Sequence, residues 1–243
     1  MTTQEFSNEF DVLYNNIMSN QAPGLDEYEK SVFLTKAQLE VLKNHFNPKG
    51  NKYGEGFDDS PKRQIDFSTL ITSAEPPAYL AGNYVKFDDR SHLYTMPNDL
   101  FIMLNETGVS NVDGVNRLIS IIPIDFAEYS RLMSKPYKQP LKNQGWRLLQ
   151  SNRSTNSISE VIVKYNSTLS KYKIRYVRRP KPIVLANLAD EYSNISIEGV
   201  STISECELDP ILHSEILQRA VELAKAAYVG DLKSSVELGQ RSE

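Results

Sequence analysis

The stretch SKYKIRYVRRPKPIVL, residues 170–185, is the one around which the rest of the chain is organised. Two sets of side chains alternate along its first half: Tyr172, Ile174 and Tyr176 in one set, and Lys171, Lys173 and Arg175 in the other. Successive side chains of a β-strand point to opposite faces, so the first set is predicted to face a core and the second to face solvent or a partner. Pro180 and Pro182 keep the chain extended beyond the strand.

Charge is distributed unevenly around this strand. Residues 130–182 carry 13 basic side chains and one acidic side chain, whereas residues 1–129 have a net charge of −9 and residues 183–243 a net charge of −7. The whole chain of 243 residues has a net charge of −4. A basic middle between acidic ends predicts a surface of segregated sign, which suits nucleic acid, an acidic partner or an acidic copy of the same protein.

Apolar periodicity predicts helices on both sides of the basic block. The first covers residues 4–19, and the second extends from Asp26 to Phe46, with Glu29 in the capping-box position. The second helix is apolar on two sides, so it needs cover on two sides, either within the subunit or from a neighbouring subunit. The clearest helix starts at Asp209 and Pro210 and continues to residue 228.

Between these helices the sequence predicts short strands joined by polar turns. The expected strands lie at residues 93–95, 100–105, 118–122, 146–150, 158–165, 172–178 and 196–206. Asn111 and Gly114 supply turn chemistry between the second and third of them. Short connections predict that residues 146–178 form an antiparallel meander. A short helix is expected at residues 125–134, with Asp125 as its cap.

The fold class predicted from these elements is α+β. An N-terminal helical hairpin in residues 1–71 and a helix within 207–229 form one discontinuous α-helical part. Residues 72–206 form an inserted antiparallel β-rich part, and residues 230–243 form a mobile tail. No apolar run approaches the roughly 20 residues that a membrane helix needs. The single cysteine, Cys206, excludes an intrachain disulfide.

The sequence contains no recognisable pattern for catalysis or for metal or cofactor binding. The three histidines have no metal-ligand spacing, and His213 is interpreted as a satisfied core or interface histidine. The carboxylate pairs Asp58–Asp59 and Asp88–Asp89 lie in loop-like sequence and are interpreted as solvated turns rather than Mg²⁺ ligands. Cys206 is interpreted as a small buried residue. The sequence therefore predicts no enzyme, no cofactor and no metal site.

Four pieces of the chain, taken in order, resemble a known family. They are LDEYEKSVFLTKAQLEVLKNHF (25–46), PIDFAEYSRLMSKPYKQP (123–140), RYVRRPKPIVL (175–185) and ELDPILHSEILQRAVELAKAAY (207–228). Together they resemble the head–tail connector (adaptor or ring) structural proteins of tailed bacteriophages, above all those of crAss-like phages. Each piece alone is weak, but the ordered set spans most of the chain.

The resemblance implies a non-enzymatic structural virion protein in the neck or tail region, assembled in the host cytoplasm. It implies a homo-oligomeric ring of about twelve copies that joins the portal vertex to the tail around the DNA channel. The implied partners are the portal protein and other tail or neck ring proteins, with non-specific contact to genomic DNA in the channel and no membrane. The α-helical part would then be the adaptor part that docks on the portal.

Interface candidates come from the basic strand block and from the apolar helices. They are Lys173, Arg175, Arg178, Arg179 and Lys181, together with Tyr28, Val32, Leu39, Leu42, His213, Ile216 and Ala220. Three interpretations of the basic block, residues 131–181, stay open: charge complementarity to a protein, a channel wall that faces DNA, and a solvated face. The acidity of the whole chain favours a protein partner. A nucleic-acid-binding module that uses the same block is the alternative function.

Overall fold

The computed structural model describes most of the chain. The described residues are 1–17, 24–46, 61–79, 86–112, 114–151, 157–164, 166–191 and 195–229. The predicted loop at 47–60, with Asp58 and Asp59, and the predicted tail at 230–243 lie outside them.

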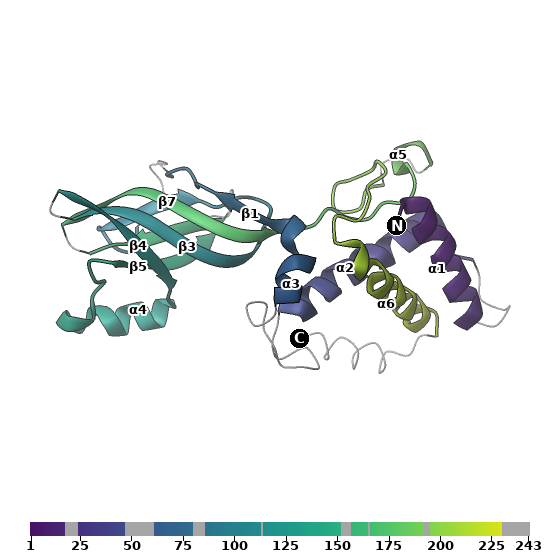
Figure 1. Cartoon of the computed structure of the whole chain (residues 1–243), viewed down its shortest axis with the longest axis horizontal. Coiled ribbons are helices and arrows are strands. Elements are labelled where there is room, and N and C mark those ends of the chain that lie inside the picture. The colour runs from purple at the N-terminus through teal and green to yellow at the C-terminus, as the bar shows by residue number, and fades with distance from the viewer. Residues whose placement is uncertain are drawn as a thin grey trace. The chain divides into compact units, whose positions relative to one another are not determined.

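Contacts divide the chain into two units, which are drawn in Figure 1 and described here one at a time. The helical unit comprises Met1–Leu70 and Pro180–Glu243, and the sheet unit comprises Ile71–Arg179. The inserted β-rich part expected at 72–206 therefore ends earlier in the structure. Residues from Pro180 onward belong to the helical unit, because they pack along its second helix. Helices in one unit and strands in the other give the predicted α+β class.

Two helices of the helical unit, at residues 27–46 and 210–229, begin where capping residues predict. The helices of this unit are α1 (Thr3–Ile17), α2 (Glu27–Phe46), α3 (Pro61–Asp66), the 3-10 helix η1 (Ser68–Leu70), α5 (Leu188–Glu191) and α6 (Pro210–Val229). Ahead of α2 the predicted capping box is present: Glu29 N–H donates to Asp26 Oδ1 at 2.7 Å, and Asp26 N–H donates to Glu29 Oε2 at 3.1 Å. At α6, Asp209 Oδ1 accepts from Ile211 N–H at 3.0 Å.

The core of the helical unit forms where α6 packs along α2 and also contacts α1. Leu34, Leu42, Ile216 and Ala220 are each 0 % exposed there. Because α1 lies mainly against α6 rather than against α2, three helices share the core. The C-terminal helix thus shares one core with the first two helices, and α1 packs mainly on α6 rather than pairing closely with α2.

The second side of α2 is covered by the extended chain that follows the basic strand. Thr35 Oγ1 accepts from Ile183 N–H at 3.2 Å and donates to Ile183 O at 3.3 Å. One turn earlier, Ser31 Oγ accepts from Leu185 N–H at 3.0 Å and donates to Glu27 O at 2.6 Å. Both apolar sides of α2 are thus covered within the subunit. The hydroxyls of Thr35 and Ser31 fasten the segment to the helix.

The strand expected at 196–206 is absent from the structure. Only two isolated bridges form there, between Ile197 and Val200 and between Val184 and Ser204. Glu198 (φ 49°) and Gly199 (φ 84°) lie between the first pair. Two successive residues with positive φ make a tight turn, so the chain reverses where the sequence predicts an extended run.

The sheet unit contains one seven-stranded sheet in the order β1-β7-β3-β4-β5-β6-β2. Its strands are β1 (Ile71–Ala74), β2 (Ser91–Thr95), β3 (Leu100–Val112), β4 (Val115–Pro123), β5 (Gln144–Ser151), β6 (Ser157–Ile162) and β7 (Ser167–Arg178). The β3–β4 hairpin confirms the predicted turn, in which Asn111 Oδ1 accepts from the N–H of Gly114 (φ 80°). Helix α4 (Phe126–Met133) and the 3-10 helix η2 (Pro136–Lys138) connect β4 to β5. Asp125 precedes α4 but makes no side-chain capping bond.

The predicted meander is wrong at its last step. Strands β5 and β6 pair antiparallel as expected, but β7 pairs with β3 and β1 instead of with β6. Strand β2, from earlier in the chain, occupies the other edge of β6. Strand β7 is long enough to pair along nearly the whole of β3. It therefore forms more backbone hydrogen bonds there than it could form with the shorter β6. In addition, β4 and β5 are parallel, because the α4 connection returns the chain to the same end of the sheet.

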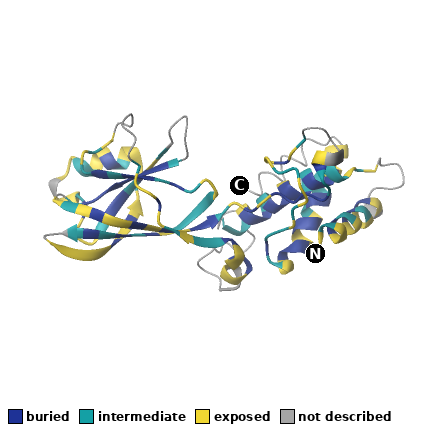
Figure 2. Ribbon diagram, turned by 90° about the horizontal axis from the view of Figure 1, so that it is seen from above, coloured by how far each residue is buried: buried dark blue, intermediate teal, exposed yellow. Residues whose placement is uncertain are grey.

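The sheet curls until its edges meet. Residues just after β1 pair with the opposite edge strand β2: Tyr79 N–H donates to Leu93 O at 2.8 Å, and Thr95 N–H donates to Pro77 O at 3.0 Å. Buried and exposed residues alternate along the strands (Figure 2). The inward side chains form one core: Tyr94, Met96, Ile119, Ile121, Val161, Val163, Leu169, Tyr172, Ile174 and Tyr176. The predicted inward set of β7 is therefore confirmed.

A charged network is buried inside the curled sheet. Arg147 Nε on β5 lies 2.7 Å from Glu106 Oε1 on β3, and their side chains are only 11 % and 3 % exposed. Tyr172 OH donates to Glu106 Oε2 at 2.6 Å and lies 3.3 Å from Ser159 Oγ. Burial raises the pKa of Glu106, against the opposing effects of Tyr172 and Arg147. The close pair with Arg147 and the hydrogen bond from Tyr172 compensate the buried Glu106 carboxyl.

Candidate interaction surface

The outer side of β7, β3 and β4 forms a broad face with both basic and apolar side chains. We call it the β7–β3–β4 face and define it by these outward residues: Lys171, Lys173 and Arg175 on β7, Thr107 and Val109 on β3, and Leu118 and Ile122 on β4. The alternation that buries Tyr172, Ile174 and Tyr176 places the basic set outside, as the sequence predicts.

Strand register sets the basic and apolar side chains beside one another on this face. Val109 pairs with Lys171 on one side and with Leu118 on the other. Leu118 is 73 % exposed and Ile122 is 40 % exposed, which is unusual for large apolar side chains in the middle of a strand. The face therefore has a basic edge along β7 and an apolar edge along β4, with β3 between them.

The charges on the basic edge are available for binding. Lys173 forms an ion pair with Glu75 at 2.9 Å, but both side chains are more than half exposed. The hydrogen bond from Lys173 lowers the pKa of the Glu75 carboxyl. An exposed pair of this kind contributes little stability and is easily exchanged for another carboxylate.

The other predicted basic residues lie past the end of the face. Arg178 is half-buried and Arg179 is exposed, with Arg179 N–H donating to Asp99 O at 2.6 Å. Lys181 belongs to the helical unit, where its N–H donates to Glu207 Oε2 at 3.0 Å and its Nζ lies 3.8 Å from Glu207 Oε1. The structure thus groups Lys173 and Arg175 with Lys171, and not with the three cations that follow.

The predicted apolar interface residues are mostly used inside the helical unit. Leu42, His213, Ile216 and Ala220 are buried in its core. Tyr28 and Val32 are half-buried against Val184, Leu188 and Ile197, and Leu39 is half-buried. In this conformation the first four do not reach the surface, so they are not accessible to a partner.

The neighbouring part of the outer side, over β5 and β6, is already covered within the unit. Tyr129 from α4 packs on Trp146, Leu148 and Ile162, which point outward from β5 and β6. Asp88 joins this layer through Arg90 NH2 at 2.6 Å and through the Tyr129 hydroxyl. Although desolvation acts to raise it, these hydrogen bonds lower the pKa of Asp88 to about 2. Asp88 is therefore a nearly buried ion-pair partner, so its interpretation as part of a solvated turn is wrong.

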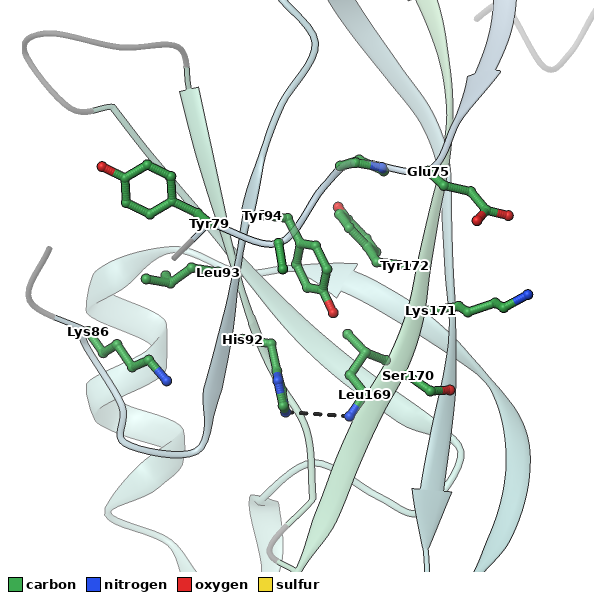
Figure 3. Close-up of a pocket in the computed structure, with 12 residues that line it drawn as sticks. Glu75, Tyr79, Lys86, His92, Leu93, Tyr94, Leu169, Ser170, Lys171 and Tyr172 are labelled. Carbon is green, nitrogen blue, oxygen red and sulfur yellow. Dashed lines mark hydrogen bonds between the residues drawn. The ribbon is translucent and has the colours of Figure 1, made fainter. Parts of the chain in front are cut away.

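A cavity of about 410 Å³ opens where the curled sheet closes. Figure 3 shows Tyr94 and Tyr172 in it, with Lys86 and Lys171 on opposite sides. The Nε2 atom of His92 accepts from Leu169 N–H at 3.4 Å, so this ring is engaged by the backbone. Among the described residues that line the cavity, no base stands beside a nucleophile.

Other reactive groups are also occupied or shielded. Burial raises the pKa of the Cys206 thiol to about 11, so it is not a thiolate at neutral pH. His213 Nε2 donates to Leu208 O at 3.1 Å, and its Nδ1 lies 2.8 Å from the amino group of Met1. Within the described residues no group of three or more His, Cys, Asp or Glu could hold a metal ion, and no helix could cross a membrane.

Sequence comparison assigns the chain to a family over nearly its whole length. The model of a family described as phage tail ring protein 3/4 matches residues 1–235. The chain belongs to this phage tail ring protein family. Ring protein 4/5 of Bacteroides phage crAss001 is 60% identical over 244 residues, which cover 100% of both chains. Ring protein 3 of the same phage is 34% identical over 230 residues, covering 92% of this chain and 95% of the relative. The resemblance to crAss-like phage ring proteins is confirmed.

The apolar edge of the face is the part of this ring-family surface that sequence reasoning missed. The strand at 118–122 was expected, but Leu118 and Ile122 were not recognised as surface residues. The segment RLISIIP is apolar at successive positions, so both sides of its strand are apolar. Both sides of such a strand must be shielded from water. The apolar pattern therefore predicts that either a second layer of the same chain or a partner protein packs on the outer side.

Two histidines, the half-buried His92 and the buried His213, predict acid sensitivity in this family member. Burial lowers the pKa of His92 and of His213, so the folded protein binds fewer protons than the unfolded chain below the unfolded value of about 6.5. The contribution of these histidines to stability is therefore fully present above about pH 6.5 and is lost as the pH decreases below that value.

Urea unfolding at about pH 7 and pH 5.5 measures this effect, with fluorescence of Trp146 reporting on the sheet unit. The variant His92→Gln should lose less stability between the two pH values than the wild type. The raised pKa of Glu106 acts in the opposite direction in both proteins, so their difference isolates His92. Equal losses in the two proteins would show that His92 does not sense pH.

Proposed function

We propose that the protein is a structural, non-enzymatic virion component that forms a homo-oligomeric ring in the neck or tail. The observation that carries this is the 60% identity, over the full length of both chains, to a ring protein of phage crAss001. The geometry supports this proposal in two ways. The described residues include an exposed face that could bind a partner, and their reactive side chains are hydrogen-bonded or buried.

The finer proposal is that this ring is an adaptor that joins the portal vertex to the tail around the DNA channel. About twelve copies would assemble in the host cytoplasm, in contact with the portal protein and with other ring proteins. Phage crAss001 has two related ring proteins that are named with different numbers, which supports contacts between rings of similar subunits. The helical unit and the β7–β3–β4 face supply the binding surfaces, with apolar area providing affinity and charge providing register.

The native mass of the purified protein tests this function. The chain has a mass of 27.6 kDa. We expect it to form a closed oligomer, either alone or when mixed with the portal protein or the neighbouring ring protein of the same phage. If the chain stayed monomeric alone and after mixing with each of these partners, that result would contradict the proposed function. A ring that forms only on a partner would support the adaptor function in particular.

A nucleic-acid-binding module is the second candidate, because Lys171, Lys173 and Arg175 are spaced along one exposed edge. Phosphate contacts of this kind weaken steeply with salt. Binding to generic duplex DNA that falls steeply with salt, in a chain that forms no ring at any concentration, would favour this candidate. We expect instead that weak DNA binding, if any, accompanies ring formation.

A further inference from the structure

The two units of the chain carry charges of opposite sign. The sheet unit has 15 Lys and Arg against 9 Asp and Glu, a net charge of +6. The helical unit has 12 Lys and Arg against 22 Asp and Glu, a net charge of −10. Two copies of this chain therefore attract each other when the sheet unit of one approaches the helical unit of the other.

The outer side of α1 matches the β7–β3–β4 face in chemistry. This helix contains Glu5, Glu9 and Asp11 and has no lysine or arginine. Asp11 is taken up by an ion pair with Lys30 at 2.7 Å, but Glu5 and Glu9 are exposed. Val12 is 59 % exposed and Leu13 is 36 % exposed on the same helix. Residues 5, 9, 12 and 13 follow i, i+4, i+7 and i+8 spacing, so they share one side.

The dimensions of the two surfaces also agree. The acidic part of α1 is centred near residue 7 and the apolar part between residues 12 and 13, which are about 8 Å apart along a helix. The basic edge on β7 and the apolar edge on β4 are two strand spacings apart, about 10 Å. A helix that crosses these strands places its acidic part over the basic edge and its apolar part over the apolar edge.

We propose that α1 of one copy binds across the β7–β3–β4 face of the next copy. Glu5 and Glu9 then pair with Lys171, Lys173 and Arg175, while Val12 and Leu13 cover Leu118 and Ile122. The contact joins different surfaces of identical chains, so it repeats head to tail and closes into a ring when the rotation between neighbours closes. This inference rests on the proposed ring function and names the contact that builds the ring.

Charge reversal on each side tests the contact. The face variant is Lys173→Glu with Arg175→Glu, and the helix variant is Glu5→Lys with Glu9→Lys. Because like charges across an interface are strongly unfavourable, each variant alone should need at least about tenfold more protein to assemble than the wild type. Combining all four substitutions in one chain should restore assembly to within about threefold of the wild type.

Mixing the two variants distinguishes a contact between copies from one within a copy. In the mixture, the acidic helix of the face variant meets the basic face of the helix variant, and the basic helix of the helix variant meets the acidic face of the face variant. Rings with alternating subunits should therefore form, although neither variant assembles alone. A contact within one chain would give no rescue on mixing, and that result would overturn the proposal.

A matched control carries the same change of charge elsewhere on the sheet unit. Arg131 is 68 % exposed on α4, and Lys138 is exposed in η2, so Arg131→Glu with Lys138→Glu should assemble like the wild type. Thermal unfolding of every variant checks that it is folded. If the wild type assembles and the face and helix variants do so equally well, the docking inference fails and the ring function stands. If the wild type assembles neither alone nor on its partners, the ring function itself fails.

Discussion

Replacing Arg147 with methionine is expected to lower the free energy of unfolding of the sheet unit by about 3–5 kcal/mol. The substitution leaves Glu106, with its side chain 3 % exposed, as a buried carboxyl whose cation is gone. Tyr172 still donates one hydrogen bond to it, but a buried charge without its partner is among the most costly defects in a protein interior. The expected loss is large because both groups lie inside the curled sheet, where water cannot replace the missing charge.

Trp146 is the single tryptophan and lies beside Arg147 in the same strand, so its fluorescence during urea unfolding reports on the sheet unit. The double variant Arg147→Met with Glu106→Gln removes both charges and should recover most of the lost stability. Arg175→Met, on the outer side of β7, is the control and should change stability by no more than about 0.5 kcal/mol. A double variant as unstable as Arg147→Met would mean that packing, and not the ion pair, sets the loss.

Replacing Thr35 with valine is expected to destabilise the helical unit by about 2–4 kcal/mol, although the two side chains have nearly the same shape. The hydroxyl of Thr35 satisfies both the N–H and the C=O of Ile183, and Ile183 is 0 % exposed. Valine leaves both backbone groups buried without a partner, and the cost of such groups is their full desolvation. The backbone of Ile183 should then lose its attachment to α2, while the bond between Ser31 and Leu185 remains.

Urea unfolding followed by helical circular dichroism measures this loss, because the long helices α2 and α6 both belong to the helical unit. Thr69→Val is the matched control. Thr69 donates to Glu207 O at 3.0 Å at an exposed site, where water can take the place of the hydroxyl, so its loss should be below about 1 kcal/mol. Equal losses in the two variants would show that burial of the Ile183 backbone is not the cause.

The three-dimensional arrangement of the face favours a protein partner over DNA. The basic side chains of β7 share one face with exposed Leu118 and Ile122 of β4. Large apolar side chains in that position make no favourable contact with the phosphates of a DNA backbone. A protein surface that is both acidic and apolar suits the face better, and α1 is such a surface on the same chain. The sequence alone left a protein, DNA and solvent open as the environment of the basic block.

Local patterns in the sequence were sufficient to predict the helix starts, the β3–β4 turn and the two sides of β7. Capping residues such as Asp26 and Asp209 act within one turn of their own helix, and the alternation of β7 follows from the period of a strand. The four ordered pieces also sufficed to recognise the ring family. In each case the information lies within a short window or in the order of windows.

Tertiary structure alone decided which strands pair and which surfaces remain open. Strand β7 joins β3 and β1 rather than β6, because β2 from earlier in the chain already holds that edge. The apolar sides of α2 and α6 close on each other and on residues 183–185, while the apolar side of β4 stays exposed. Two apolar stripes look alike in a sequence, and only the packing of distant segments determines which is a core and which is an interface. SKYKIRYVRRPKPIVL accordingly splits at Pro180, with Lys171, Lys173 and Arg175 on the open face of the sheet unit and residues 183–185 fastened to α2.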